Sequence, residues 1–396
     1  MSQWDTVQFE QLLVDNKISY GVVQPGAFQT NAGTPLIRVN NIKNGKIDVS
    51  GIVRIHDDIA QKHSKTRLNG GELLITVVGA VGECAIVPKN LSGYNVARAV
   101  SVAKIKDIFD KRFIAYQFKT EDIKFQMYGN TNDTVQPTLN LSELKKLIFR
   151  LPKLSEQKAI ASVLSALDDK IDLLDRQNRT LESMAETLFR HFFIEEAKET
   201  WTSGTIKDEF DFVMGQSPSG SSFNEEGKGM PMYQGNADFG FRFPSNRVFT
   251  TEPTRFAEPL DTLISVRAPV GAQNMALEKC CIGRGLSAFR FKTNHKFYTY
   301  TYFKLHQLMN EIKHFNDEGT VFGSISKSDF EKIEITTPPY DKISSFEDIA
   351  KPVNDKVIKN CHQIAKLEKI RDTLLPKLMS GEVRVQYAEE AIASVA

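Results

Sequence analysis

Long apolar runs are missing from the sequence. No stretch of its 396 residues approaches the roughly 18 consecutive apolar residues of a membrane-spanning helix. The segment Met1–Glu10 has no basic stretch followed by an apolar core, so it does not resemble a secretory signal. Cysteine is also scarce, with neither a Cys-x-x-Cys pair nor a plausible disulfide framework. We therefore expect a cytoplasmic protein with buried, unpaired thiols at Cys84, Cys280, Cys281 and Cys361.

Familiar catalytic motifs are absent as well. The sequence has no Gly-x-x-x-x-Gly-Lys-Ser/Thr phosphate loop, no His-Glu-x-x-His, no Gly-x-Ser-x-Gly and no Gly-x-Gly-x-x-Gly after a predicted strand. No Pro-Asp dipeptide occurs, so a nuclease site built from Pro-Asp and Glu-x-Lys has no support. We predict that the chain has no catalytic residues, binds no metal and carries no cofactor of its own.

One segment comes close to a catalytic motif. Thr337-Pro338-Pro339-Tyr340 resembles the Asn/Asp-Pro-Pro-Tyr motif with which amino-methyltransferases hold an exocyclic amine. Position 337 carries Thr instead of Asn or Asp, and no Gly-rich cofactor loop precedes it. Prolines just before a helix explain the segment without any catalytic role. A self-contained DNA methyltransferase or nuclease is therefore kept only as an alternative interpretation of the sequence.

Charge of either sign does not dominate. The 50 basic and 49 acidic residues leave a formal net charge of +1, so the overall charge does not indicate a polyanionic partner. With 41% hydrophobic and 25% charged residues, the composition is that of a folded protein, and the length favours at least two domains. Any nucleic-acid interface must come from local patterns.

The sequence does contain an internal duplication. At a constant offset of 186 positions the following pairs match: Arg98-Ala99-Val100-Ser101 with Arg284-Gly285-Leu286-Ser287, Thr134-Val135 with Thr320-Val321, Ser142-Glu143-Leu144 with Ser328-Asp329-Phe330, and Leu181-Glu182 with Leu367-Glu368. Earlier stretches match only with drifting offsets. Because loops absorb insertions and packed helices do not, each half is predicted to be a variable globular domain followed by a fixed helical segment.

Residues 1–153 and 197–339 are the two predicted globular domains. Both contain short β-type runs punctuated by Gly and Pro, such as Leu73–Val78, and helical stretches such as Phe109–Thr120 and Phe297–His314. This mixture predicts two similar α+β domains.

Residues 154–196 and 340–381 are predicted to be two long helices, with a tail at 382–396. In each, apolar residues recur at alternating steps of four and three, which is the seam of a coiled coil. The first seam is Ile160, Leu164, Leu167, Ile171, Leu174, Asn178, Leu181, Ala185, Leu188 and Phe192, and the second is Phe346, Ala350, Val353, Val357, Asn360, Ile364, Leu367, Arg371, Leu374 and Leu378. A helix of about 39 residues is about 58 Å long and needs a partner, which the copy supplies. Met184 and Phe189, beside the first seam, are expected to be exposed and to offer a docking surface.

The two seam asparagines predict how the helices pair. If the helices run antiparallel with Ile160 opposite Leu378, then Asn178 falls opposite Asn360. Two buried amides can satisfy each other's hydrogen bonds, whereas an amide opposite Leu or Ile cannot. We therefore expect an antiparallel coiled coil whose register depends on Asn178 and Asn360.

These features together resemble one known family, the specificity subunits of type I restriction-modification systems. Leu151-Pro152-Lys153-Leu154-Ser155-Glu156-Gln157-Lys158-Ala159-Ile160 is similar to that family's lead-in to its first conserved helix, and Asp168-Asp169-Lys170-Ile171 is similar to a pattern within it. The closing Leu374–Val383 segment is similar to the family's usual ending. The second lead-in, Pro338-Pro339-Tyr340-Asp341, departs from the pattern because it lacks the Glu-Gln pair.

The resemblance implies a function in DNA recognition. Each globular domain would read one half of a bipartite, asymmetric site on double-stranded DNA, and the helix pair would set the spacing. The helices would also dock two modification subunits, which carry S-adenosylmethionine, and restriction subunits would join them. A helical adaptor that binds only proteins is a third possibility.

DNA contacts are expected from amide, hydroxyl and guanidinium side chains on loops. In the first domain the candidates are Arg38, Asn40, Asn41, Arg98, Asn132, Thr134 and Gln136. In the second domain the repeat selects Gln234, Asn236, Arg267, Arg284, Thr320 and Ser324. Arg98 and Arg284 are the strongest candidates because they occupy matched positions, although a structural ion pair would explain them equally.

Overall fold

The computed structural model describes residues 4–129, 137–267, 269–314 and 323–386. Its contacts divide the chain into two compact units. Unit 1 contains the first globular domain together with residues up to Ile171 and from Lys366 onward, and unit 2 contains Asp172–Ala365. No described helix is both long enough and apolar enough to span a membrane. The four thiols are unpaired, as expected; three are buried and that of Cys361 is partly buried.

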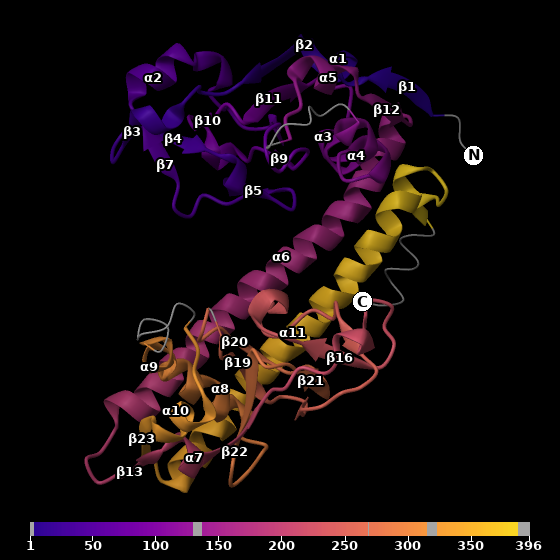
Figure 1. The fold of residues 1–396 in the computed structure, drawn as a ribbon. Coiled ribbons are helices and arrows are strands. Elements are labelled where there is room, and N and C mark those ends of the chain that lie inside the picture. The colour runs from indigo at the N-terminus through magenta and orange to yellow at the C-terminus, as the bar shows by residue number, and fades with distance from the viewer. Residues whose placement is uncertain (1–3, 130–136, 268, 315–322, 387–396) are drawn as a thin grey trace. The chain divides into compact units, whose positions relative to one another are not determined.

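Two small sheets form the body of the first domain (Figure 1). In one, the strands follow the antiparallel order β2 (Leu13–Tyr20), β11 (Val100–Ile105), β8 (Leu73–Thr76) and β9 (Cys84–Ile86). In the other, the order is β10 (Asn95–Val96), β4 (Thr34–Ile37), β7 (Val53–Ile55) and β3 (Gln29–Thr30), with β10 parallel to β4. All four residues of β8 are buried, which explains its unbroken apolar sequence.

Short elements complete the first domain and lead into the long helix. They are β1 (Asp5–Gln8), α1 (Phe9–Leu12), α2 (Asp57–Lys62), α3 (Lys111–Gln117), α4 (Glu121–Tyr128), α5 (Leu141–Lys146) and β12 (Ile148–Leu151). β1 pairs antiparallel with β12, which ends three residues before α6. Phe9, Phe118 and Phe149 pack their rings together beneath this pair, with ring centroids 5.2–5.4 Å apart. The start of the long helix is thereby fixed to the domain core.

The second domain repeats this plan. One sheet has the order β14 (Phe210–Met214), β22 (Leu286–Phe291), β19 (Thr262–Ser265) and β20 (Gln273–Met275). The other has the order β15 (Phe223–Asn224), β17 (Phe249–Thr250), β16 (Met230–Tyr233), β21 (Cys280–Ile282) and β18 (Phe256–Ala257), with β16 parallel to β21. The remaining elements are β13 (Thr202–Thr205), α7 (Ile206–Glu209), α8 (Tyr298–Gln307), α9 (Met309–His314), α10 (Lys327–Lys332) and β23 (Glu334–Thr337). Two similar α+β domains are therefore present, as predicted.

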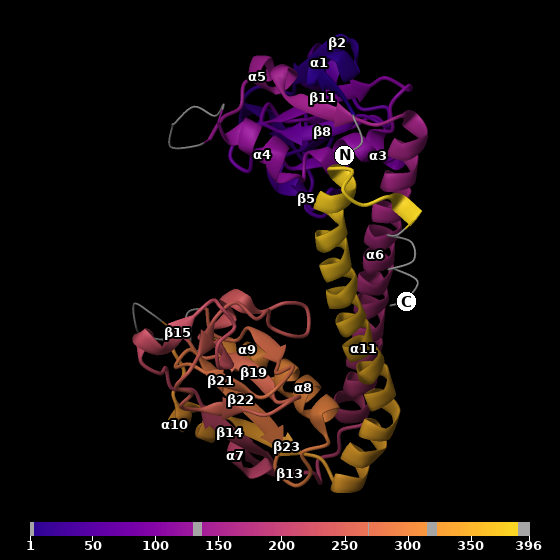
Figure 2. The same ribbon diagram turned by 90° about the vertical axis from the view of Figure 1, so that its right-hand side faces the viewer.

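The two long helices are α6 (Leu154–Arg190), followed by a π-helical turn at His191–Glu195, and α11 (Tyr340–Met379). Each contributes to both units, and within each unit the two helices lie side by side and run antiparallel (Figure 2). In unit 1, Ile160 and Leu164 share a core with Leu374 and Leu378. In unit 2, the rings of Phe192 and Phe346 are 5.8 Å apart. The antiparallel coiled coil predicted from the heptads is confirmed.

The seam asparagines meet in unit 2. Asn360 Nδ2 donates to Asn178 Oδ1 at 2.9 Å and to Gln177 Oε1 at 2.9 Å. Asn178 Nδ2 in turn lies 3.6 Å from the sulfur of Cys361. Both asparagines are buried, so the predicted contact is an internal one.

One expectation about the helices is wrong. Met184 is 50% exposed, as expected, but Phe189 is only 4% exposed. Its ring packs against Phe303 of α8 and Phe346 of α11, which cover it from two sides. The globular domain therefore buries a position that the heptad pattern alone leaves at the surface.

Candidate nucleic-acid interface

Arg98 is carried by a tight turn that follows β10. The amide of Ala97 donates to Ile37 O at 2.8 Å, and the amide of Val77 donates to Ala99 O at 2.9 Å. These two bonds fix the backbone on both sides of Arg98, whose own side chain is exposed. The position of the guanidinium therefore depends on a backbone that the two sheets hold in place.

Arg284 is carried by an equivalent turn that follows β21. The amide of Gly283 donates to Tyr233 O at 2.8 Å, and the amide of Val266 donates to Gly285 O at 2.8 Å. Arg284 is also exposed. The turn is close-packed, because a Cβ at Gly285 would lie 2.1 Å from the carbonyl oxygen of Gln234.

The two arginines therefore occupy the same structural position in the two repeats. Among the described residues, neither Arg98 nor Arg284 forms an ion pair. The structural ion pair that would have explained the matched arginines equally well is thus not found among the described residues. A cation held on a fixed turn and exposed to solvent is suited to contact a phosphate or a base edge.

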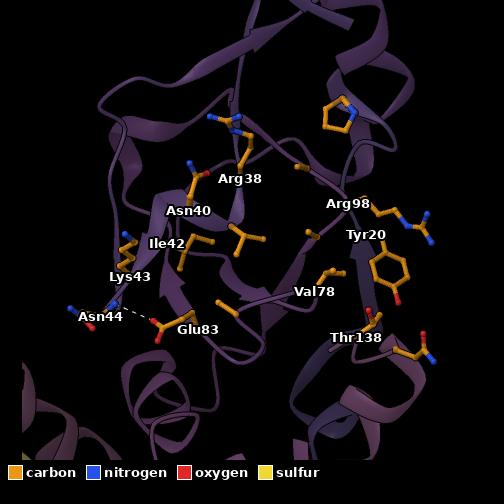
Figure 3. Close-up of a pocket in the computed structure, with 16 residues that line it drawn as sticks. Tyr20, Arg38, Asn40, Ile42, Lys43, Asn44, Val78, Glu83, Arg98 and Thr138 are labelled. Carbon is orange, nitrogen blue, oxygen red and sulfur yellow. Dashed lines mark hydrogen bonds between the residues drawn. The ribbon is translucent and has the colours of Figure 1, made fainter. Parts of the chain in front are cut away.

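A hollow of about 980 Å³ lies beside Arg98 in the first domain. Figure 3 shows Arg38 and Asn40 on one side of it and Tyr20 and Arg98 on the other. Three of the candidates predicted from sequence are therefore brought together. Among the described residues that line the hollow, Glu83 carries the only carboxylate, and that carboxylate accepts the amide of Asn44 at 3.0 Å.

Arg38 sits where β4 ends and the chain turns. Its guanidinium is partly buried, and its Nε has no hydrogen-bond partner among the described residues. Because a buried N–H without an acceptor is costly, an incoming oxygen or nitrogen acceptor would be favoured at this place. Asn40, two residues later, is exposed at the rim.

The side chain of Asn41 is buried in the turn, whereas that of Asn40 is exposed. Its Oδ1 accepts the amide of Arg38 at 2.9 Å, and its Nδ2 donates to Asp48 O at 2.9 Å. The side chain is 5% exposed, so both ends of the amide are committed to the turn. Asn41 was expected to contact DNA, but in the structure it holds the turn that presents Arg38 and Asn40, and we leave it out of the candidate interface.

The second domain places its candidates on matching elements. Gln234 and Asn236 follow β16 as Arg38 and Asn40 follow β4, and Gln234 is exposed. The backbone of Gly283 packs against Gln234, which brings this side chain next to the Arg284 turn.

Arg267 and Ser324 occupy a second pair of matching positions. They form an isolated antiparallel bridge, equivalent to the bridge between Val78 and Thr138 at the edge of the first hollow. Arg267 and Ser324 are both exposed. The second domain therefore carries an arginine where the first domain carries Val78.

The segment after Asn236 is anchored to the long helices. Arg242 is 1% exposed, its Nη2 donates to Glu182 Oε2 of α6 at 2.8 Å, and its guanidinium lies 4.0 Å from the ring centroid of Tyr302. Burial raises the pKa of Glu182, and the nearby Arg242 opposes that shift. The ring of Phe243 lies 5.8 Å from that of His362 on α11. Contacts of Arg242 and Phe243 with the two long helices therefore hold this segment in place.

Four candidates, Asn132, Thr134, Gln136 and Thr320, lie outside the described residues. Sequence reasoning also missed most of the residues that line the hollow, among them Tyr20, Lys43 and Asn44. The sequence did contain a signal for Lys43 and Asn44, because the dipeptide Asn44-Gly45 is typical of a hairpin turn. Asn44 and Gly45 adopt the positive φ that such a turn requires, at 53° and 82°. The turn lifts Lys43 and Asn44 to the edge of the hollow.

The described residues were also compared with the requirements of a metal site and of the amino-methyltransferase motif. Within the described ranges, no group of three or more His, Cys, Asp or Glu residues could hold a metal ion. The Oγ1 of Thr337 donates to the buried carboxylate of Glu209 at 3.3 Å, and Thr337 ends a strand paired with β13. Pro338 and Pro339 then lead directly into α11, which agrees with a helix-start role for this segment.

Comparison with known proteins agrees with the duplicated architecture. A family model described as the type I restriction modification DNA specificity domain matches residues 15–183 and again 198–358. The chain is 30% identical over 381 residues to the putative type I restriction enzyme MjaX specificity subunit of Methanocaldococcus jannaschii, covering 89% of this chain and 88% of that protein. It is 28% identical to the MjaIX specificity subunit of the same organism, covering 80% of this chain and 78% of that one.

A solved structure shows the same fold. The S subunit of a type I restriction-modification system from M. genitalium superposes with a TM-score of 0.62 at 20% identity, covering 95% of this chain and 96% of that one.

Proposed function

Because the chain belongs to the type I restriction-modification DNA specificity family, we propose that it is the sequence-specific DNA-binding subunit of such a system. The observation that carries the proposal is the structural equivalence of Arg98 and Arg284, two exposed cations on matched, rigid turns. A duplicated reading surface suits a DNA target that is itself divided into two parts.

Each domain reads one half of an asymmetric site. In the first domain the contacts come from Arg38, Asn40 and Arg98 around the hollow. In the second they come from Gln234, Asn236, Arg267, Arg284 and Ser324. The two sets differ in chemistry, since Arg38 is replaced by Gln234 and Val78 by Arg267. Guanidinium groups favour guanine and amides favour adenine in the major groove, so the two halves should differ in sequence.

The paired helices set the distance between the two half-sites. α6 is one continuous helix of 37 residues, and at about 1.5 Å per residue it is about 55 Å long, which equals the length of roughly 16 base pairs. The buried Asn178–Asn360 contact opposes slippage of one helix along the other, which supports a fixed spacing.

The helices also bind the two modification subunits. Large apolar side chains on them are about half exposed, namely Leu173 (51%), Met184 (50%) and Ile349 (51%). Apolar side chains that stay exposed on these helices are available to a protein partner, because burying them on binding would remove apolar surface from water. The modification subunits bind S-adenosylmethionine and carry out methylation, restriction subunits join them to cut DNA, and this chain contributes recognition without catalysis.

The direct test uses the purified full chain, alone and with its modification subunits, titrated with duplex DNA at several salt concentrations. We expect binding that weakens steeply as salt rises, because cations on the protein displace counterions from phosphates. Incubation of the chain alone with DNA and labelled S-adenosylmethionine should transfer no methyl group. Methylation or cleavage by the chain alone would establish the alternative, a self-contained enzyme, and absence of all DNA binding would favour a protein-only adaptor.

A further inference from the structure

A second depression adjoins the hollow of the first domain. It measures about 310 Å³ and shares Tyr20 with the larger hollow. Lys62 at the end of α2, together with His63 and Lys65 in the following turn, lines it. We refer to Lys62, His63 and Lys65 as the basic corner.

The two lysines of the basic corner form no ion pair among the described residues. Both are exposed, and none of the described residues that line the depression is acidic. Asp57 and Asp58 lie in the first turn of α2, and the carboxylate of Asp57 accepts the hydroxyl of Thr34. Lysines that line a concave place without an acidic residue favour an anionic ligand.

A buried asparagine holds the basic corner in place. Asn95 is 0% exposed, and its Nδ2 donates to the carbonyl oxygens of His63 at 3.2 Å and Ala60 at 3.4 Å. Its Oδ1 accepts the hydroxyl of Thr66 at 2.8 Å. The turn that carries the lysines is therefore bonded from both ends to the first residue of β10.

The same strand leads to Arg98. Asn95 begins β10, and the turn that carries Arg98 follows that strand directly. The turn of the basic corner and the turn of Arg98 are therefore attached to the same short strand.

Among the residues that the structure describes, the second repeat has no equivalent of this arrangement. Cys281 stands 186 positions after Asn95 and occupies its place in the parallel bridge, pairing with Met232 where Asn95 pairs with Leu36. A thiol cannot replace the three bonds that the Asn95 amide makes to the basic corner, and residues 251–255, which precede β18, contain no helix. The basic corner is therefore a feature of the first domain and is not part of the shared scaffold.

We propose that the basic corner is a backbone-phosphate clamp that grips the DNA beside the half-site read by the first domain. The proposal rests on the DNA-binding function proposed above. Lys62 and Lys65 supply charge without reading bases, so the clamp raises the affinity for every sequence and positions Arg38, Asn40 and Arg98 over the bases.

The test compares the full chain, with its modification subunits, as wild type and as the Lys62→Gln/Lys65→Gln double variant. On duplexes with and without the preferred sequence, we expect affinity to fall by the same factor, roughly tenfold per lost phosphate contact at about 0.1 M salt. The slope of log affinity against log salt should decrease by about 0.9 for each contact. Lys104→Gln, an exposed lysine of β11 that lines neither depression, is the matched control and should change neither quantity.

Neutral methylphosphonates placed one at a time in the DNA then locate the clamp. Substitutions beside the first half-site should weaken the wild type but not the double variant, and Lys62→Arg/Lys65→Arg should behave as wild type. If wild type binds DNA and the double variant keeps its affinity and salt slope, the clamp is wrong and the proposed function stands. If wild type binds no duplex, the proposed function fails and the clamp fails with it.

Discussion

Asn360 of α11 donates a hydrogen bond of 2.9 Å to Asn178 of α6 in the centre of a mostly apolar seam. In an antiparallel pair only one register brings the two amides together. Slippage by one heptad would place each amide against an apolar residue, leaving its polar atoms unsatisfied. The contact therefore acts on specificity of pairing more than on stability.

Replacing one of these asparagines should cost more than replacing both. Asn360→Leu leaves Asn178 Oδ1 buried without its donor, while Asn178 Nδ2 keeps its contact with Cys361 Sγ. This change should lower the free energy of unfolding by about 1–3 kcal/mol. The double variant Asn178→Leu/Asn360→Leu should recover most of that loss, because two apolar residues then face each other. Chemical denaturation of the four proteins of the cycle measures this. Simple addition of the two single losses would contradict the paired role.

Arg98→Ala and Arg284→Ala should each relax base preference in one half-site only. Loss of a bidentate contact costs about 1–3 kcal/mol of discrimination at the bases concerned. Binding to a panel of duplexes with single-base changes in either half measures this. Arg179→Ala, an exposed arginine of α6, serves as the control. Equal effects of one variant on both halves would refute the assignment of one domain to each half.

Asn40→Ala and Asn41→Ala should differ although the residues are neighbours. Asn41→Ala removes two hydrogen bonds from a buried turn and should lower stability by about 1–3 kcal/mol, with weaker DNA binding as a consequence. Asn40→Ala should leave the melting temperature unchanged and alter only DNA preference. Thermal unfolding and binding measured on the same samples separate the two. A destabilised Asn40→Ala protein would show that Asn40 is structural.

Stability should fall as pH rises from 5 to 8, owing in part to Glu347. Burial raises the pKa of this α11 carboxyl from 4.5 to about 7, while the amides of Tyr300 and Thr299 oppose the shift by donating to it. Between these pKa values the unfolded chain loses the proton and the folded chain keeps it, so ionisation favours unfolding by about 2–3 kcal/mol.

Glu347→Gln should flatten this dependence, since the amide does not titrate. Unfolding free energies at pH 5, 6, 7 and 8 measure the slope, and Glu334→Gln on the exposed side of β23 is the control. An unchanged slope in the Glu347→Gln protein would exclude this carboxyl as the source.

Local periodicity predicts the helices well and the surfaces between elements poorly. The heptads predict α6 and α11 because each helix depends on spacing within one segment. They also predict the Asn178–Asn360 contact, because the register of two such seams fixes which positions face each other. Phe189 was misjudged because the cover over it comes from Phe303, which is distant in sequence. Matching the two repeats could not predict this burial, because it compares equivalent positions in the sequence and gives no information about which side chains pack against them.

The candidate interface shows the same division. Arg98 and Arg284 were found because the repeat keeps one offset through their turns. Asn40 and Asn41 have the same chemistry, and only burial distinguishes a base contact from a turn-holding amide. Tyr20 ends β2 and the basic corner follows α2, and both line the smaller depression, so no single stretch of sequence contains the signal.

In the proposed function, two related domains read the two parts of one divided DNA target. Selection of preferred duplexes from a randomised pool, using the full chain with its modification subunits, tests this most directly. We predict two short, different motifs separated by a gap of constant length and indifferent sequence. Enrichment of a single continuous motif, or of two motifs at variable separation, would contradict it.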